Sequence, residues 1–287
     1  MVMPRVSGLY VYPVKSARGI AVTDWHVSRM GLSGDRQWMV VGEDGMFVAQ
    51  RQSDGMGIGV KSMSLVHTKL DNLALTCTAS MMEPLILPVV GVEGEAIATQ
   101  IWTTECMGID QGEEAAEWFT EFLSRERPGK YRLVRMPDYP GEGFRKAKRG
   151  DAHVGYADAD TFLIIGQSSL DDLNGHIVGE ALPMNRFRPN IVVSGCKAYA
   201  EDKWGEIRIG GVALTGTKEC VRCPITTQDQ DTTERGKEPL ATLARYRKVP
   251  EEGVVFGMNF VHHMSGVIQP IRIGDVVEVL GERESFL

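Results

Sequence analysis

The amino-acid sequence predicts a mainly β (α+β) protein, built of two β-barrel-like units with a few peripheral helices. Most of the chain consists of short segments that alternate apolar and polar residues or carry β-branched and aromatic residues, as strands do. Only three segments have the 3.6-residue periodicity of helices. The chain has 287 residues, enough for one large domain or two ordinary domains with proper cores.

The N-terminal part is predicted to be a series of strands. They are expected at Val6–Val14, Ala21–Met30, Gln37–Val41, Val60–Lys69, Leu73–Ala79 and Ala96–Thr103. Gly42-Glu-Asp-Gly45 predicts a hairpin turn into a strand at Met46–Gln50, because Asp-Gly tolerates the positive φ that such turns need.

The periodicity then changes to that of a helix. Glu113–Ser124 places Ala116, Phe119, Phe122 and Leu123 on one face, and Arg127-Pro-Gly is expected to end the helix. Pro137–Asp151, rich in basic residues and containing Pro140-Gly-Glu-Gly, is the expected connection between domains. The predicted division is therefore an N-terminal β-barrel-like domain over residues 3–120, a helix end and connecting segment over 121–150, and a second domain over 151–282.

The second part is predicted to open with a strand at Thr161–Ile165 and a helix at Ser169–Ile177. Ser168 with Asp171, and Ser169 with Asp172, have the S-x-x-D form of a helix N-terminal cap. The remaining elements are expected to be a hairpin at Glu206–Gly216 around Gly210-Gly211, a helix at Glu238–Arg247 with Pro239 in its first turn, and strands at Val254–Phe260, Val267–Arg272 and Val276–Leu280.

Composition excludes several classes of protein. The net charge of -7 argues against a general nucleic-acid binder, and any anionic ligand must be held by a local cluster of Lys and Arg. No apolar run approaches the length of a membrane helix, and the N-terminus lacks the features of a signal peptide or presequence, so a cytoplasmic location is expected. Five cysteines without framework spacing favour a reducing compartment.

The pair Cys220-x-x-Cys223 allows four interpretations. A structural zinc site needs about four protein ligands, which the remaining isolated cysteines do not supply. A redox dithiol is expected at the N-terminus of a helix, whereas this pair lies beside a predicted hairpin. The third interpretation is a pair of buried structural thiols, and the fourth is one thiolate bound to a soft redox metal. The polar residues that surround the pair favour the metal thiolate.

Weaker signals lie nearby in the sequence. His262-His263 could bind a metal, but adjacent strand residues face opposite sides, so one buried and one exposed histidine is the expected arrangement. Asp229 and Asp231 could orient a proton or a substrate, or they could cap a turn. The cationic candidates for an anionic ligand are Lys15, Arg36, Arg51, Arg186, Arg188 and Arg222. In Arg186-Phe-Arg188, strand periodicity would put both arginines on one face.

Four motifs together resemble a known family. They are Tyr12-Pro-Val-Lys15-Ser16, Gly34-Asp-Arg36-Gln-Trp38, Arg186-Phe-Arg188-Pro-Asn190 and Cys220-Val-Arg-Cys223. In this combination the chain resembles the MOSC (molybdenum-cofactor sulfurase C-terminal) superfamily, and within it the amidoxime-reducing component branch. The resemblance extends from Leu9 to Leu280.

The resemblance implies a set of site residues. Cys223, the second cysteine of the motif, would be the catalytic metal ligand. The other contacts of the molybdenum cofactor (Mo-molybdopterin) would be Lys15, Ser16, Arg36, Asp160, Arg188, Val221, Arg222 and Asn259. Two positions depart from the family pattern: the family tends to have hydroxyl groups where this chain has Ala159 and Asp160, and its eukaryotic members have a tyrosine near Asn259.

The resemblance also implies an activity. The protein would be a molybdenum-dependent oxidoreductase that reduces N-hydroxylated or N-oxide substrates with electrons from a separate donor, a flavoprotein reductase with a haem or ferredoxin-type carrier. The sequence has no dinucleotide-binding fingerprint, haem motif or iron–sulfur cysteine set of its own. The alternatives are a non-catalytic carrier of molybdenum cofactor or sulfur, and a β-barrel binding module without a metal.

Overall fold

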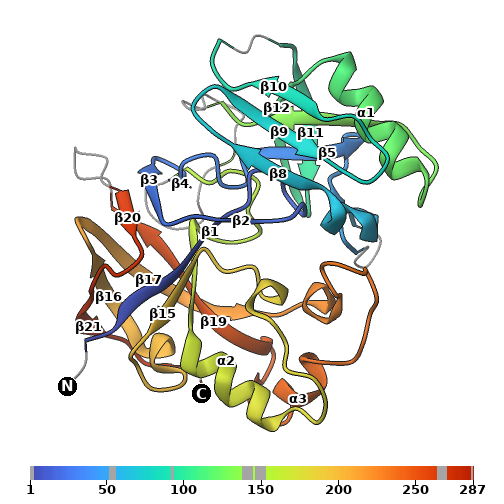
Figure 1. The fold of residues 1–287 in the computed structure, drawn as a ribbon. Coiled ribbons are helices and arrows are strands. Elements are labelled where there is room, and N and C mark those ends of the chain that lie inside the picture. The colour runs from blue at the N-terminus through green and yellow to red at the C-terminus, as the bar shows by residue number, and fades with distance from the viewer. Residues whose placement is uncertain are drawn as a thin grey trace.

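The computed structural model describes residues 3–51, 56–91, 94–137, 145, 153–263, 270–285 and 287. Two lobes are visible in Figure 1, with β5 (Trp38–Gly42), β8 (His67–Leu70) and α1 (Glu113–Ser124) in the upper one. The described residues are mostly strands with three α-helices, so the prediction of a mainly β fold with a few helices is confirmed. None of these helices is long and apolar enough to cross a membrane.

The lower lobe is built on a nine-stranded sheet. Its order is β2 (Ile20–Ala21), β1 (Arg5–Val11), β15 (Ile191–Ser194), β14 (Phe162–Gly166), β19 (Gly253–His262), β17 (Val212–Val221), β16 (Trp204–Ile209) and β21 (Val277–Glu282), with β18 (Lys248–Val249) paired to β19. All neighbours are antiparallel except β14 and β15. Helix α2 (Gln167–His176) and the short α3 (Leu240–Leu243) lie at the lower end of this sheet (Figure 1).

The upper lobe contains two small sheets and helix α1. One sheet has the order β11 (Ala96–Ile101), β12 (Thr104–Asp110), β13 (Tyr131–Arg135) and β5, and the other β10 (Leu85–Pro88), β9 (Ala74–Thr78) and β8. The apolar face of α1 explains its position, because Phe119 and Leu123 are fully buried among residues of both sheets. A core of this kind supplies most of the stability of a short amphipathic helix.

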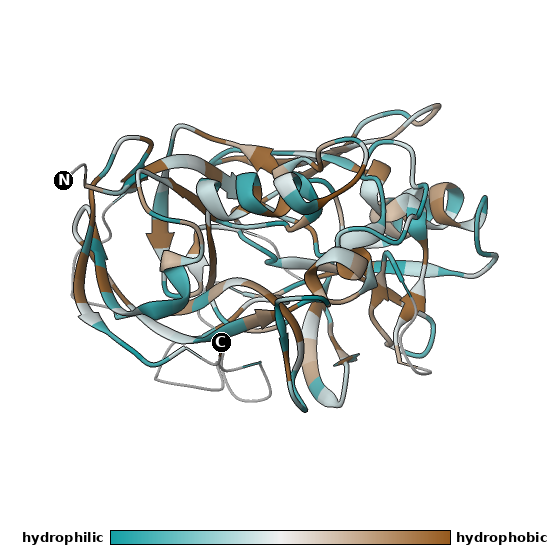
Figure 2. Cartoon of the chain, turned by 90° about the horizontal axis from the view of Figure 1, so that it is seen from below, coloured by the Kyte–Doolittle hydropathy of each residue, from teal (hydrophilic) through white to brown (hydrophobic). Residues whose placement is uncertain are grey.

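Two smaller sheets complete the fold. One contains β3 (Asp24–Ser28), β4 (Gly31–Leu32) and β20 (Pro270–Arg272), and the other contains β6 (Val48–Ala49) and β7 (Ile58–Gly59). Figure 2 shows polar and apolar stretches side by side on the same ribbons, as expected of elements that bury one face. The division at residues 120 and 150 stays a prediction. Its first unit contains β1, which pairs with β15 of the second.

Several predicted elements are confirmed. Helix α1 has the predicted bounds, the turn at Gly42–Gly45 closes with a hydrogen bond of 3.0 Å from Gly45 N to Gly42 O, and Gly210 has a φ of 57° in the predicted hairpin. The expected connection at Pro137–Asp151 lies outside the described residues except for Pro137 and Arg145.

The strand predicted at Val60–Lys69 is wrong in its first half. Lys61–Leu65 forms a 3-10 helix, η1, and only His67–Leu70 is a strand. The carboxylate of Glu126 explains the difference, because it accepts hydrogen bonds from the backbone N–H groups of Lys61 and Ser62 at 2.9 and 2.8 Å. These are the unpaired donors at the start of a helical turn.

The predicted cap of the helix at Ser169 is also wrong. Helix α2 begins at Gln167, and neither Ser168 nor Ser169 caps it, since no side chain does. The hydroxyl of Ser169 instead donates to the buried carboxylate of Glu201, and Ser168 donates to the carbonyl of Cys196. Tertiary partners have replaced the local cap.

The helix predicted at Glu238–Arg247 is reduced to the four residues of α3. Tighter turns follow α3, with hydrogen bonds of 3.1 Å from Arg245 N to Thr242 O and 3.2 Å from Tyr246 N to Leu243 O, and Arg247 then forms a buried ion pair of 2.6 Å with Asp202. Directly afterwards β18 pairs with β19.

Candidate functional site

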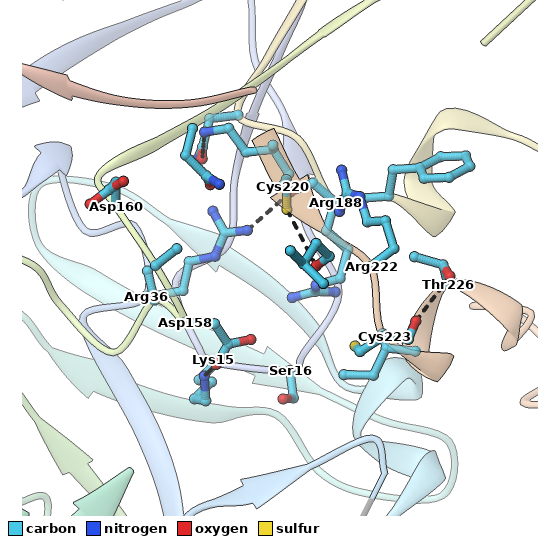
Figure 3. A pocket seen from close by; sticks show the side chains of 18 of the residues that line it. Lys15, Ser16, Arg36, Asp158, Asp160, Arg188, Cys220, Arg222, Cys223 and Thr226 are labelled. Carbon is cyan, nitrogen blue, oxygen red and sulfur yellow. Dashed lines mark hydrogen bonds and ion pairs between the residues drawn. The ribbon is translucent and has the colours of Figure 1, made fainter. Parts of the chain in front are cut away.

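A pocket of about 280 Å³ lies between the two lobes (Figure 3). Its wall contains all nine residues that the sequence resemblance selected: Lys15, Ser16, Arg36, Asp160, Arg188, Val221, Arg222, Cys223 and Asn259. These residues come from segments as far apart as the loop after β1 and the middle of β19. The fold therefore brings the whole predicted set to one cavity.

Lys15 is buried at one side of the pocket. Its Nζ donates to the carbonyl of Tyr156 at 2.9 Å and forms a close ion pair with Asp158, which also accepts a hydrogen bond of 3.0 Å from the indole of Trp102. Burial lowers the pKa of Lys15 in spite of this carboxylate. Burial also opposes ionisation of Asp158, but the attraction and hydrogen bond of Lys15 outweigh it, so the pKa of Asp158 is lowered.

Two guanidinium groups share the ring of Tyr12. The Cζ atoms of Arg36 and Arg188 lie 4.0 and 4.4 Å from the ring centroid, a cation–π geometry. Arg36 is neutralised by an ion pair of 2.7 Å with Asp35, whereas the Arg188 side chain forms no hydrogen bond or ion pair with the described part of the chain. Burial lowers the pKa of Arg188 to about 10, so the group is cationic at neutral pH.

The strand predicted through Arg186 and Arg188 is wrong. Arg186 ends a 3-10 turn, η2 (Met184–Arg186), Arg188 has a φ of 53°, and the strand begins only at Ile191. Side chains hold this irregular backbone: Arg36 Nη2 donates to the Arg188 carbonyl at 3.1 Å, and Arg222 Nη1 donates to the Phe187 carbonyl at 3.0 Å. Arg186 and Arg188 nevertheless both line the pocket, together with Phe187.

Cys223 lies where β17 has ended and a 3-10 turn, η4 (Pro224–Thr227), begins. Its carbonyl accepts hydrogen bonds from the backbone N–H of Thr226 at 3.2 Å and from the Thr226 hydroxyl at 3.0 Å. The thiol is free and half-buried on the pocket wall. Cys220 is a separate pocket residue on β17, and Figure 3 shows the two sulfur atoms pointing to different parts of the cavity.

Three further polar residues of the pocket are held by the neighbouring backbone and side chains. Asp160 accepts a hydrogen bond from the Thr217 hydroxyl, and Asn259 on β19 donates to the carbonyl of Lys218 at 3.3 Å. Arg222 donates through Nε to the Phe256 carbonyl at 2.8 Å. Its Nη2 is buried without a partner.

The weaker sequence signals have structural explanations. Asp229 caps a turn, because its Oδ1 accepts the N–H groups of Asp231 and Thr232 at 2.9 Å each, and Oδ2 pairs with Arg186 at 2.9 Å. His262 is buried and His263 is exposed, as predicted. Asp231 pairs with Arg18, and Arg51 stacks on Trp102 outside the pocket lining.

The pocket residues fit a phosphorylated cofactor with a soft metal. Among the described residues no three His, Cys, Asp or Glu side chains could hold a metal ion by themselves. A metal here would take one protein thiolate, from Cys223, and its other ligands from the cofactor. The uncompensated charge of Arg188 and the unpartnered Nη2 of Arg222 suit an anionic group such as a phosphate.

Sequence reasoning missed several lining residues. They are Gln50, Ala157, Leu163, Asn190, Lys218, Ile225 and Thr226. Most belong to segments next to a recognised motif, but Gln50 had no sequence signal. It lies directly after β6 and reaches the pocket beside Ser16, whose carbonyl accepts its amide at 2.8 Å.

The chain is similar in sequence to one family and to several of its members. Residues 3–126 match the MOSC N-terminal beta barrel domain, and residues 151–278 match the MOSC domain. Mitochondrial amidoxime-reducing component 1 of Mus musculus is 36% identical over 295 residues, covering 96% of this chain and 82% of that protein. Mitochondrial amidoxime reducing component 2 of Homo sapiens is 36% identical over 287 residues, with 95% and 82% covered. The YuaD protein of Bacillus subtilis matches in structure over 96% of this chain and 95% of that chain, with a TM-score of 0.40 and 12% identity.

Proposed function

Because the chain belongs to the family of MOSC proteins with an N-terminal beta-barrel domain, we propose that it is a molybdenum-cofactor-dependent oxidoreductase that reduces N-oxygenated compounds. The family membership that the motifs predicted is confirmed by relatives named amidoxime-reducing components. The substrate class comes from those names. The single observation that supports the proposal most is the meeting of all nine predicted residues, with the free thiol of Cys223, in one cationic pocket.

Each residue has a role in this proposal. Cys223 would hold the molybdenum, because a thiolate suits a soft metal that changes oxidation state. Arg188, with Arg222, would hold the cofactor's phosphate, and Lys15, paired with Asp158, would contact the cofactor from another side of the pocket. Asp160 and Asn259 would contact the polar heterocycle. When bound, the cofactor would supply the two electrons that cleave an N–O bond, a reaction that also consumes two protons and releases water.

The source of the electrons is part of the same proposal. The described residues contain no group of three His, Cys, Asp or Glu side chains that could hold a metal, and the sequence has no nucleotide-binding fingerprint, which supports an external donor. We propose a separate donor that passes single electrons, made of a flavoprotein and a haem or ferredoxin-type carrier. We also propose a cytoplasmic location, which the five free cysteines support.

Metal analysis of gently purified protein tests the proposal. Molybdenum close to one atom per chain with little zinc, and reduction of an N-hydroxylated amidine by the same preparation with reduced viologen, are the expected results. Zinc in place of molybdenum would contradict the proposal. Protein loaded with molybdenum that reduces no N-oxygenated compound would favour the carrier alternative.

A further inference from the structure

We propose that Gln50 and Gln230 form a buried clamp that fixes the Cys223 turn against the loop of Lys15 and Ser16. The clamp would set the separation between the thiol and the opposite wall of the pocket. This inference rests on the proposed function in one respect, because it takes Cys223 and Ser16 to contact the same bound cofactor.

The two glutamine side chains are paired through both of their amides. Gln50 Nε2 donates to Gln230 Oε1 at 2.9 Å, and Gln230 Nε2 donates to Gln50 Oε1 at 3.0 Å. Each amide also donates its second hydrogen to a backbone carbonyl: Gln50 donates to Ser16 O at 2.8 Å, and Gln230 donates to Gln228 O at 3.2 Å. Every amide hydrogen of the pair therefore has an acceptor, and both side chains are buried, with exposures of 0% and 4%.

The pair connects segments far apart in the sequence. Gln50 follows β6 in the N-terminal part and lines the pocket, and Gln230 lies in the loop directly after the 3-10 turn that begins at Cys223. The same loop is attached nearby by Gln228, which donates to the Lys61 carbonyl at 3.0 Å and to the Ser64 hydroxyl at 3.2 Å. The Cys223 turn is thus held by side chains that bond to the N-terminal part.

A buried amide pair fixes the relative position of two segments more than it raises the stability of the protein. Two apolar side chains of the same size could fill the same space, and such replacements are often neutral in stability. They would not fix the register, because apolar contacts are non-directional whereas hydrogen bonds lose strength rapidly when they are bent or stretched. The complete pairing of Gln50 and Gln230 allows one arrangement of the two segments, and this arrangement sets the distance across the pocket.

The test uses three full-length variants, Gln230→Met, Gln50→Met/Gln230→Met and the control Gln111→Met. Gln111 is a partly buried glutamine of the upper lobe whose amide donates to the Ile109 carbonyl at 3.0 Å. Each variant is prepared with its cofactor and also from a host that makes no molybdopterin. The measurements are the rate at which iodoacetamide alkylates Cys223, read by peptide mass spectrometry, the rate of molybdenum release, and the unfolding midpoint.

We expect alkylation of Cys223 in the cofactor-free protein and release of molybdenum to be about ten-fold faster in Gln230→Met than in the wild type. Gln111→Met should change neither rate. The double variant leaves neither amide unpaired, so its unfolding midpoint should return towards the wild-type value while both rates stay fast. If Gln230→Met does not fold, the double variant provides the same rates.

Rates in Gln230→Met within two-fold of those in Gln111→Met would overturn the clamp. Recovery of both rates in the double variant would also overturn it, since the pair would then be only a packing contact. The alkylation measurement needs no cofactor, so it decides the clamp even in a protein that binds no molybdenum. Conversely, a failed clamp would leave the molybdenum content of the wild type as evidence for the proposed function.

Discussion

The guanidinium group of Arg188 lies on the ring of Tyr12, with its Cζ atom 4.4 Å from the ring centroid. No carboxylate of the described chain neutralises it, although its neighbour Arg36 has Asp35 at 2.7 Å. A buried cation without a counterion is costly unless a ligand supplies the opposite charge. The ring of Tyr12 reduces this cost and keeps the group facing the pocket, so Arg188 is the strongest candidate for contact with an anionic cofactor.

Replacing Arg188 tests this role. Loss of one charge-assisted contact should reduce cofactor affinity about 10- to 100-fold in Arg188→Ala, and Arg188→Lys should recover only part of it, because an ammonium lacks the planar fork. Molybdenum and pterin content of the purified variants measure the effect. The matched control is Arg208→Ala, an exposed arginine that pairs with Glu278 at 3.5 Å. Equal cofactor content in the Arg188 and Arg208 variants would show that Arg188 does not contribute to cofactor binding.

The two cysteines of the motif should differ in function. Cys223→Ala is expected to abolish molybdenum-dependent turnover, since no other described residue offers a soft ligand at the start of that turn. Cys220→Ser should keep most of the metal and activity, because Cys220 lies on β17 in another part of the pocket. Parallel metal analysis and turnover assays decide the matter. A Cys220 variant that loses its metal while the Cys223 variant retains it would reverse the ligand assignment.

Tyr12 predicts a pH dependence of stability. Burial raises the pKa of its phenol to about 12, from an ordinary value of 10 in the unfolded chain. The folded protein therefore holds this proton more tightly, and the stability gained is complete below pH 10 and is lost as pH rises from 10 through 12. The contribution of Tyr12 to the slope is up to about 1.4 kcal/mol per pH unit in that window. Arg188, whose pKa is lowered to about 10, contributes a slope of the opposite sign, so the effect of Tyr12 is the difference between the wild type and Tyr12→Phe. Urea unfolding at several pH values measures it.

The control for this pH dependence is Tyr12→Phe. This variant keeps the ring beneath both guanidinium groups but removes the hydroxyl, which donates to the Pro189 carbonyl at 3.1 Å. Its stability should fall less steeply between pH 10 and 12 than that of the wild type. Identical slopes in the two proteins would show that other groups cause the alkaline loss.

The need for an electron donor gives a further prediction. Fully molybdenum-loaded protein should be inactive with NAD(P)H and an N-hydroxylated substrate, because the sequence offers no site for a nicotinamide or flavin. Activity should appear with reduced viologen, or with a flavoprotein plus a haem or ferredoxin-type carrier. Parallel assays with and without each donor are sufficient. Turnover with NAD(P)H alone would reveal a redox site absent from the proposal.

Local patterns predicted much of the fold. The amphipathic face of Glu113–Ser124 and the Gly210-Gly211 turn are sufficient by themselves to define α1 and the β16–β17 hairpin. The errors arose where a distant side chain replaced a local interaction. Glu126 accepts hydrogen bonds from the first backbone N–H groups of Lys61–Leu65, which forms a 3-10 helix. The hydroxyl of Ser169 donates to Glu201 and therefore does not cap the N-terminus of α2.

The motifs predicted which residues line the site, but not the hydrogen bonds that hold those residues in place. Lys15, Arg188 and Cys223 each lie in a recognisable motif, and the sheet order brings these motifs together. The positive φ of Arg188 depends on Arg36 and Arg222 bonding to the backbone around it, a tertiary effect that periodicity cannot show. The reciprocal amides of Gln50 and Gln230 are equally invisible in sequence, because glutamine is usually a surface residue.

The pairing of β1 with β15 has a consequence for biosynthesis. During translation β1 leaves the ribosome well before its partner Ile191–Ser194, which emerges only after the upper lobe has been made. Until then the edge of β1 that faces β15 is unsatisfied, although β2 is already available to pair with its other edge, and nascent chains with open strand edges are prone to aggregate. A fragment cut after the first domain match, at residue 126, would keep this exposed strand permanently. The two lobes are therefore best expressed as one chain, because the large sheet joins strands from both ends of the sequence.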